Sequence, residues 1–211
     1  MSTKADQSHT TLAVRAEPVQ QRSAERITAL LDAAAELIDQ GGIDGLTTSD
    51  VATRSASSVG VVYRYFPNIQ SLLKALSARN AERFAARIQS ALPSFPQTVD
   101  GAMEAVIESY VDLARTEPGF RALRFGDVID DRFLDGVPRG ISTLPELFLS
   151  IVVERHGLTP SPELAFDLEV LVEIGDALMA RAFRDDPKGD ERYIAKLREI
   201  ASEYIHRYTS A

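Results

Sequence analysis

Apolar side chains recur at the spacing of an α-helix along most of the chain. The first such stripe ends at Gly41–Gly42 and comprises Ile27, Leu30, Leu31, Ala34, Leu37 and Ile38. Similar stripes continue to residue 205, and the alternation typical of a β-strand never extends beyond a few residues. The sequence therefore predicts an all-α protein of about nine helices.

Proline positions and local composition divide the chain into parts. Pro93 and Pro96 follow a helical segment and mark a boundary, whereas residues 1–21 lack an apolar period and are rich in Ser, Thr, Gln and Ala. A length of 211 residues fits one large or two small domains. We expect a mobile arm over residues 1–21, a first domain over 22–91 and a larger helical domain over 92–211.

Residue usage argues against several classes of protein. The chain has no Cys, its three His residues are dispersed, and it has no nucleophile–base pair or phosphate-binding glycine loop. No apolar run reaches the ~18 residues that span a bilayer. The sequence predicts a cytoplasmic protein without a catalytic site, metal, cofactor or membrane partner.

Charge is distributed unevenly. The net charge of −8 over the whole chain opposes binding to nucleic acid. Residues 1–91, however, carry ten basic and nine acidic side chains, whereas residues 92–211 carry thirteen basic and twenty-two acidic ones. The first part is therefore compatible with a polyanion, and the second is not.

Two short helices are predicted across a tight turn between residues 45 and 68. Thr47 and Asp50 have capping-box spacing, Ser58 can cap the second helix, Pro67 ends it, and Asn68 can cap the next one. This arrangement is typical of a helix-turn-helix, whose second helix can enter the ~12 Å major groove of DNA.

The second short helix has an inner and an outer side. Val62 and Phe66 face inward, against Val51 and the first helix, which leaves Gly60, Tyr63 and Arg64 outside. A glycine permits close approach to DNA, and tyrosine hydroxyls and a guanidinium suit phosphate or guanine. Free N–H groups after Ser58 also suit a phosphate.

Residues from about 22 to 88 resemble the DNA-binding domain of the tetracycline-repressor (TetR) family. The resemblance is carried by LDAAAELI, GLTTSDVA, SSVGVVYRYFPN and the LL that follows. It implies a three-helix DNA-binding domain and a divergent helical domain that binds a small-molecule effector and forms a homodimer. The DNA contacts that it implies are Thr48, Ser58, Gly60, Val61, Tyr63 and Tyr65, with Arg64 at a position that often touches DNA.

The chain departs from the family pattern at three places. Ala56 and Ser57 stand where the turn usually has Gly and Val, and Val61 replaces a polar residue. Ile69 stands where a Lys often follows the helix cap, which removes one phosphate contact. We expect compensation from the arm or the first helix, through Lys4, Arg15, Arg22 or Arg26.

The resemblance also implies that the last two long helices pair with those of a second subunit. Residues 163–183 are apolar over too wide an arc for one interface, which agrees with burial on two sides. Two-fold symmetry would place two recognition helices at half-sites about 34–36 Å apart on a palindromic operator. The predicted dimer contacts are Leu171, Leu178, Leu197, Ile200 and Tyr204.

An effector pocket in the second domain is harder to locate. Acidic rows such as Glu104, Glu108 and Asp112 would suit a cationic ligand or simply face solvent. The candidate lining residues, each of which also suits an ordinary core, are Met103, Ile107, Tyr110, Phe120, Leu123, Phe148 and Phe166.

Three functions remain open from the sequence. The leading one is a transcriptional regulator, a repressor released from double-stranded DNA by an unknown effector. The others are a helical small-molecule binding protein or enzyme with an incidental helix-turn-helix, and a DNA-binding protein without a ligand.

Overall fold

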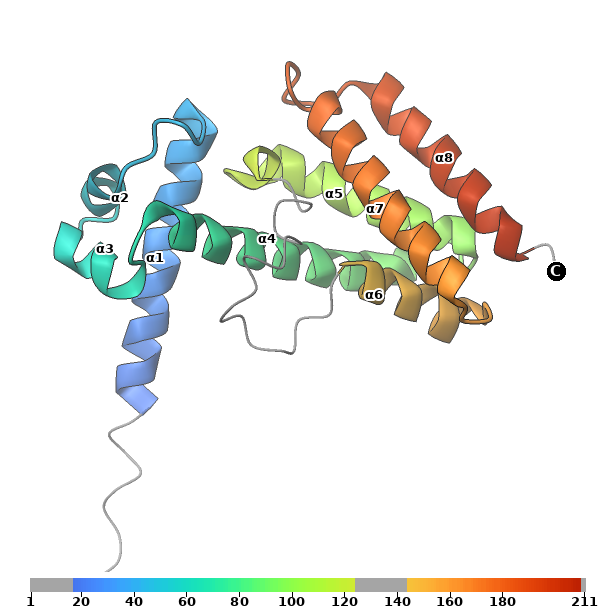
Figure 1. The fold of residues 1–211 in the computed structure, drawn as a ribbon, viewed down its shortest axis with the longest axis horizontal. Coiled ribbons are helices and arrows are strands. Elements are labelled where there is room, and N and C mark those ends of the chain that lie inside the picture. Colours follow the sequence, from blue (N-terminus) through green and yellow to red (C-terminus); the bar gives the residue numbers. More distant parts are fainter. Residues whose placement is uncertain (1–16, 124–143, 210–211) are drawn as a thin grey trace, which may run out of the picture.

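The computed structural model describes residues 17–123 and 144–209, and it is helical throughout this part of the chain (Figure 1). Two short 3₁₀ turns, η1 (Leu92–Ser94) and η2 (Phe120–Ala122), and a π-helical segment, η5 (Ile151–Arg155), accompany the α-helices. The eight α-helices of the described residues are α1 (Glu17–Gly41), α2 (Thr48–Arg54), α3 (Val59–Tyr65), α4 (Ile69–Ala91), α5 (Val99–Thr116), α6 (Leu144–Ser150), α7 (Pro162–Ala182) and α8 (Glu191–Thr209). The all-α prediction is confirmed.

Two details differ from expectation. The sequence predicts a further short helix that begins at Phe120, and the structure describes there only the 3₁₀ turn η2. Helix α1 begins at Glu17, so residues 17–21 are helical rather than part of an arm. Pro18 lies in the first turn of α1, where a proline needs no N–H, so it starts the helix instead of breaking it. Residues 1–16 of the predicted arm lie outside the described residues.

The predicted caps of the helix-turn-helix are confirmed. The Thr47 and Ser58 side chains accept hydrogen bonds from the backbone N–H groups of Asp50 and Val61, at 3.2 and 3.3 Å. Asn68 and Ser71 form a reciprocal capping box at the start of α4. These bonds satisfy N–H groups that have no partner within their helices, and so fix where each helix begins.

The turn between α2 and α3 contains a strained residue. Ala56 has φ +50°, and it is the one residue other than glycine with a positive φ among those described. A Cβ in the left-handed region lies close to the following carbonyl oxygen, at a cost of roughly 1–2 kcal/mol. Ala56, which stands where the family turn usually has glycine, therefore has a conformational consequence that the sequence pattern alone does not show.

The described residues form two hydrophobic cores that meet within α4. One core, from Leu30 to Leu76, includes Val51, Val62 and Phe66 as predicted, and the other extends from Phe84 to Ile205. Helix α4 runs from the helix-turn-helix into the C-terminal helices (Figure 1). The predicted boundary after residue 91 coincides with the end of this shared helix rather than with the division between the cores.

The turn that ends α5 packs against α1. Gly119 has φ +71°, and a Cβ there would lie 2.9 Å from both the Cα and the carbonyl oxygen of Ala35. Asp39 on α1 accepts hydrogen bonds from the Gly119 N–H at 3.4 Å and from Arg121 at 3.2 Å. The two parts of the chain are therefore joined at a second place besides α4.

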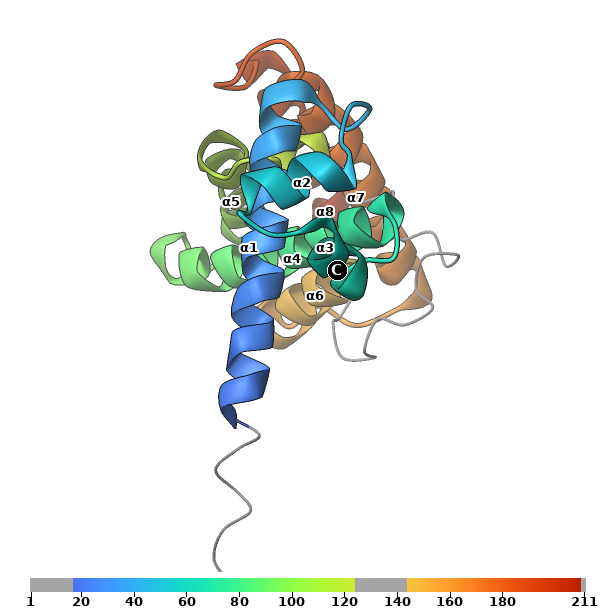
Figure 2. The same cartoon turned by 90° about the vertical axis from the view of Figure 1, so that its left-hand side faces the viewer.

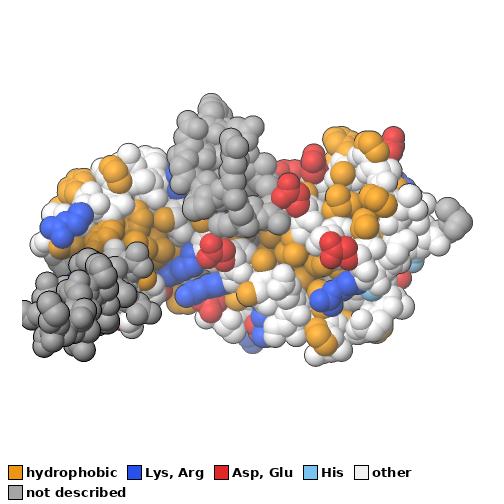
Figure 3. Space-filling view, turned by 90° about the horizontal axis from the view of Figure 1, so that it is seen from below, with side chains coloured by type: hydrophobic (Ala, Val, Ile, Leu, Met, Phe, Trp, Pro, Cys, Tyr) orange, Lys and Arg blue, Asp and Glu red, His pale blue; other side chains and the backbone are white. Residues whose placement is uncertain are grey.

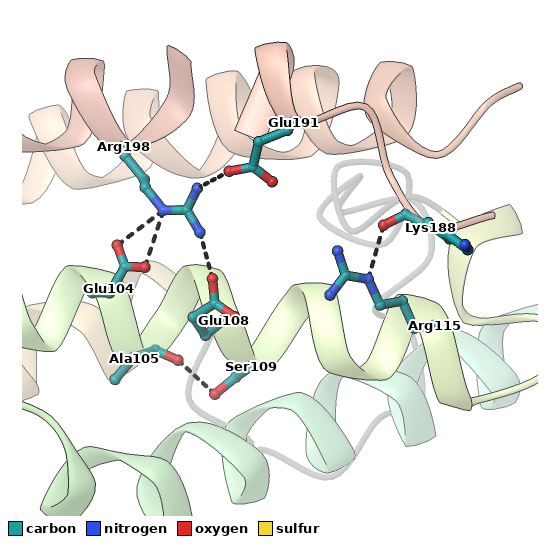
Figure 4. A network of polar contacts seen from close by, with 8 residues as sticks. All are labelled: Glu104, Ala105, Glu108, Ser109, Arg115, Lys188, Glu191 and Arg198. Carbon is teal, nitrogen blue, oxygen red and sulfur yellow. Dashed lines mark hydrogen bonds and ion pairs between the residues drawn. The ribbon is translucent and has the colours of Figure 1, made fainter. Parts of the chain in front are cut away.

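Ion pairs and a tyrosine fasten the last helix to its neighbours. Arg198 on α8 bonds to Glu104 and Glu108 on α5 and to Glu191 (Figure 4). Burial disfavours its charge, but the hydrogen bonds to Glu191 and Glu104 outweigh this effect and raise the pKa of Arg198. Tyr208 donates to Asp167 on α7 at 2.7 Å, a bond that raises the pKa of this tyrosine to about 12.

Replacement of Ala56 by glycine should stabilise the protein. Glycine adopts the left-handed conformation without strain, so Ala56→Gly should raise the free energy of unfolding by up to about 1 kcal/mol, after its larger unfolded-state entropy is subtracted. The measurement is chemical denaturation followed by circular dichroism.

The matched control is Ala86→Gly, at an exposed position within α4. There the same substitution should destabilise by about 1 kcal/mol. A loss of stability in both variants would show that the conformation of Ala56 costs nothing.

Candidate nucleic-acid interface

Helices α2 and α3 lie at one end of the molecule, where α2 crosses α1 and α3 lies beside α2 (Figure 2). The inner side of α3 is fixed by Val62, which is buried, while Gly60, Tyr63 and Arg64 are exposed and Val61 is half-buried. This is the predicted division between inner and outer sides. Because α3 lies at the end of the molecule, its exposed side can approach a groove of DNA.

Exposed large hydrophobic side chains are concentrated at two places. Among the described residues they are Val59 and Tyr63 on α3, with 38% and 51% exposure, and Phe166 on α7, with 62%. Large apolar side chains that face water often mark interaction sites. Val59 lies at the exposed start of α3 and is not among the DNA contacts predicted from the sequence.

The two tyrosines of α3 are held differently. The Thr48 hydroxyl of α2 donates to the Tyr63 hydroxyl at 3.3 Å, which brings two predicted DNA contacts together on the outer surface. Tyr65 is half-buried against the N-terminal core, and the Ser23 hydroxyl of α1 donates to its hydroxyl at 3.5 Å. Ser23 was missed, because its partner is 42 residues away in the sequence.

Helix α2 is oriented by a polar contact with α1. Arg54 donates to Glu36 at 2.9 Å and to Gln40 at 3.0 Å. Since α2 and α3 share a core with α1, this contact also helps to fix the orientation of α3. Arg54 thus positions the interface rather than belonging to its exposed face.

The other described residues singled out from the sequence, Ile69 as a missing contact among them, lie on α1, at the start of α3 and at the start of α4. Ser58 is exposed but uses its hydroxyl to cap the helix, and Ile69 is the half-buried first residue of α4. Arg22 and Arg26 are exposed on α1, whereas Lys4 and Arg15 lie outside the described residues. On the uncovered part of the face in Figure 3, the outermost charged side chains at this end are basic, and acidic ones lie further along the molecule.

The C-terminal helices enclose an apolar cavity of about 70 Å³. Of the predicted effector residues, four line it, namely Met103, Ile107, Tyr110 and Phe148. Helix α4 contributes Phe84, α8 contributes Leu197 and Ala201, and α7 contributes most of the remainder, including the buried carboxylate of Asp176.

The other predicted effector residues lie elsewhere. Phe120 is buried behind the cavity, with its ring 5.2 Å from that of Tyr110. Leu123 packs against the N-terminal core, because the turn after α5 leads back to α1. Phe166 is on the surface, since the helical period of α7 directs Leu164 and Leu168 inward and the residue between them outward.

Of the residues predicted at the dimer interface, two are buried within the protomer and three are half-buried. Leu171 and Leu197 are buried within the protomer and line the cavity, so they do not form an outer surface. Leu178, Ile200 and Tyr204 are half-buried at the margin of the core. The large apolar side chain that is exposed on the outer side of α7 is Phe166.

The acidic row on α5 is paired within the chain. Glu104 and Glu108 hold Arg198 (Figure 4), and Asp112 pairs with Arg87 at 2.8 Å. Neither a cationic ligand nor a solvated face is therefore needed to explain this row. Within the described ranges, the structure contains no cluster of three or more potential metal ligands and no helix long and apolar enough to cross a bilayer.

Comparison with known families matches both parts of the chain. Residues 30–76 match the model for bacterial regulatory proteins of the tetR family, and residues 97–208 match that for the tetracyclin repressor-like C-terminal domain. The first range coincides with the N-terminal core, from Leu30 to Leu76.

Individual proteins of known structure are also similar to this chain. A TetR-family transcriptional regulator from Streptomyces coelicolor has a similar structure, with a TM-score of 0.72 and 34% identity, over 87% of this chain and 99% of that one. The fatty acid degradation regulator FadR from Bacillus halodurans shares the fold, with a TM-score of 0.62 and 17% identity, over 85% and 94% of the two chains.

A curated relative, the HTH-type transcriptional repressor KstR from Rhodococcus jostii, is 40% identical over 63 residues, and the match spans 30% of each protein. A match over less than a third of either protein carries no conclusion about either protein as a whole. The two family models together span most of the chain, and they set aside an enzyme with an incidental helix-turn-helix. The chain belongs to the TetR family of DNA-binding transcriptional regulators.

Proposed function

We propose that this protein is a homodimeric repressor that leaves a palindromic operator when a small-molecule effector binds to its C-terminal domain. In this proposal residues 22–91 bind DNA, residues 92–211 hold the effector and the dimer interface, and the protein acts on DNA in the cytoplasm. The assignment of repression, rather than activation, is supported by the printed name of the Rhodococcus jostii relative.

The observation that carries the proposal is the exposed side of α3. Val59, Tyr63 and Arg64 face solvent there, and the bond from Thr48 fixes the Tyr63 hydroxyl. Apolar contact with thymine methyls and hydrogen bonds to phosphate or guanine are the chemistry that such side chains provide. Because Ile69 lacks a charge, we expect few phosphate contacts and a modest affinity for non-specific DNA.

The outer side of α7 supports the dimer. Phe166 is exposed, and Val170, Ile174 and Leu178 follow it at helical spacing with partial exposure. An apolar stripe on one helix favours pairing with a second copy, because a two-fold interface uses the same surface on both subunits. A dimer would also place two copies of α3 at successive half-sites.

The test of the proposed function is selection of bound duplexes from a random pool. The unmodified protein should enrich a palindromic site. Tyr63→Ala should reduce affinity for that site by about ten-fold or more, whereas Tyr63→Phe, which keeps the ring, should lose only the hydroxyl contribution. Failure to enrich a palindrome, or equal selection by Tyr63→Ala, would refute the proposed function.

Arg64→Ala distinguishes two kinds of contact. If Arg64 contacts a guanine, the variant should lose about 1–3 kcal/mol of binding free energy and relax specificity at one position. Arg64 is exposed in the last turn of α3, so we expect a loss of affinity in either case, and its pattern across sequences identifies the contact. A uniform loss across sequences, with a reduced salt dependence, would assign Arg64 to a phosphate instead.

A charge on the outer side of α7 should weaken the dimer. Phe166→Glu should raise the dimer dissociation constant by about ten-fold or more, because it places a carboxylate within an apolar interface. Sedimentation equilibrium provides the measurement. The control, Ala86→Glu on the exposed side of α4, should leave the constant unchanged, and equal behaviour of the two variants would exclude α7 from the interface.

A further inference from the structure

The lining of the C-terminal cavity restricts the chemistry of its ligand. We propose that the cavity binds an uncharged molecule of about one six-membered ring, whose single hydrogen-bond donor meets the carboxylate of Asp176. This inference rests on the proposed function only in treating that molecule as the effector. The binding itself is a property of the free protein.

The walls exclude anions. Phe84, Met103, Ile107 and Phe148 provide hydrocarbon or thioether surface, and no described lining residue is Lys, Arg or His. An anion in such a site would lose its hydration without gaining a positive partner, which is costly.

Asp176 supplies a directed acceptor. Its side chain lines the cavity from α7, and the residue is only 4% exposed. A carboxyl group has two oxygens with several lone pairs, so it can accept a hydrogen bond from a ligand in addition to the contacts that it already makes. Apolar pockets commonly use one such group to orient a ligand.

Cavity size sets the scale of the ligand. The volume of about 70 Å³ is below the ~150 Å³ of an apolar cavity known to admit benzene. One ring therefore enters only when side chains shift, and Met103 and Met179 have the flexible side chains that adjust most easily. Gly175 preserves space beside Leu197, because a Cβ there would lie 3.7 Å from two Leu197 methyl carbons.

The test uses three ligands of similar size, namely benzyl alcohol, toluene and benzoate, titrated into the free full-length protein by calorimetry. Benzyl alcohol should bind more tightly than toluene, and benzoate should bind about ten-fold or more weakly than benzyl alcohol. Binding of benzoate as tightly as benzyl alcohol, or no binding by any of the three, would overturn the proposal.

A variant within the cavity separates binding from folding. Gly175→Ala should weaken benzyl alcohol binding by about three-fold or more, since the new methyl group occupies cavity space, yet it should not lower the Tm, because alanine favours the helix. The control is Gly41→Ala at the end of α1, where a Cβ would meet nothing within 4 Å. Equal ligand affinity in the two variants would place the ligand outside the cavity.

Asp176→Asn tests the role of the carboxylate. It should reduce the preference for benzyl alcohol over benzoate by about three-fold or more, while toluene binding reports that the cavity is intact. An unchanged preference would contradict the role of Asp176. If this variant does not fold, the ligand series and Gly175→Ala still decide the proposal.

The outcomes also separate this inference from the proposed function. Benzyl alcohol binding without selection of an operator would leave the ligand site valid and refute the regulator. Operator selection without binding by any of the three ligands would support the regulator and refute the ligand site.

Discussion

Helix α4 belongs to both hydrophobic cores, and this sharing constrains the rest of the molecule. Its 23 residues span about 34 Å, with Leu72 and Leu76 in the N-terminal core and Phe84 and Ile88 in the C-terminal one. A helix packed at both ends transmits displacement instead of absorbing it, because packed interiors resist compression. The orientation of the DNA-binding part is therefore linked to the packing of the C-terminal helices.

Local features of this fold could be predicted from the sequence, and non-local ones could not. The caps at Thr47, Ser58 and Asn68 and the inner side of α3 depend on residues within one or two turns, so spacing alone indicated them. The packing of Gly119 on Ala35 and the bond from Ser23 to Tyr65 join distant parts of the chain, and no periodicity marks them. For the same reason the apolar arc of a helix indicates that two sides are buried, but not which side meets which neighbour. Leu171 and Leu197 line the cavity, and their place in a dimer interface stays a prediction.

The acidity of the C-terminal part also has a structural explanation that its composition does not provide. Glu104, Glu108 and Glu191 surround Arg198, and these contacts join α8 to α5 beside the cavity residues Leu197 and Ala201 (Figure 4). Partly exposed ion pairs contribute little stability singly, but several on one guanidinium fix geometry. The uneven charge is thus consistent with one part that approaches DNA and another in which carboxylates organise helix contacts.

Two connections lead from the cavity toward the DNA-binding part. Phe84 lines the cavity and lies on α4, about 12 Å along the helix axis from Leu76 in the N-terminal core. Tyr110 also lines it, and its ring contacts Phe120, which follows the glycine packed against Ala35 of α1. A ligand that enlarges the cavity would press on both aromatic rings. The first connection is helical, and the second passes through the turn at Gly119, which is packed against Ala35. It would shift the population away from the DNA-bound arrangement only by the difference between its affinities for the two states. A cavity too small for its ligand in the DNA-bound state would provide that difference, since the expanded form alone would accommodate the ring.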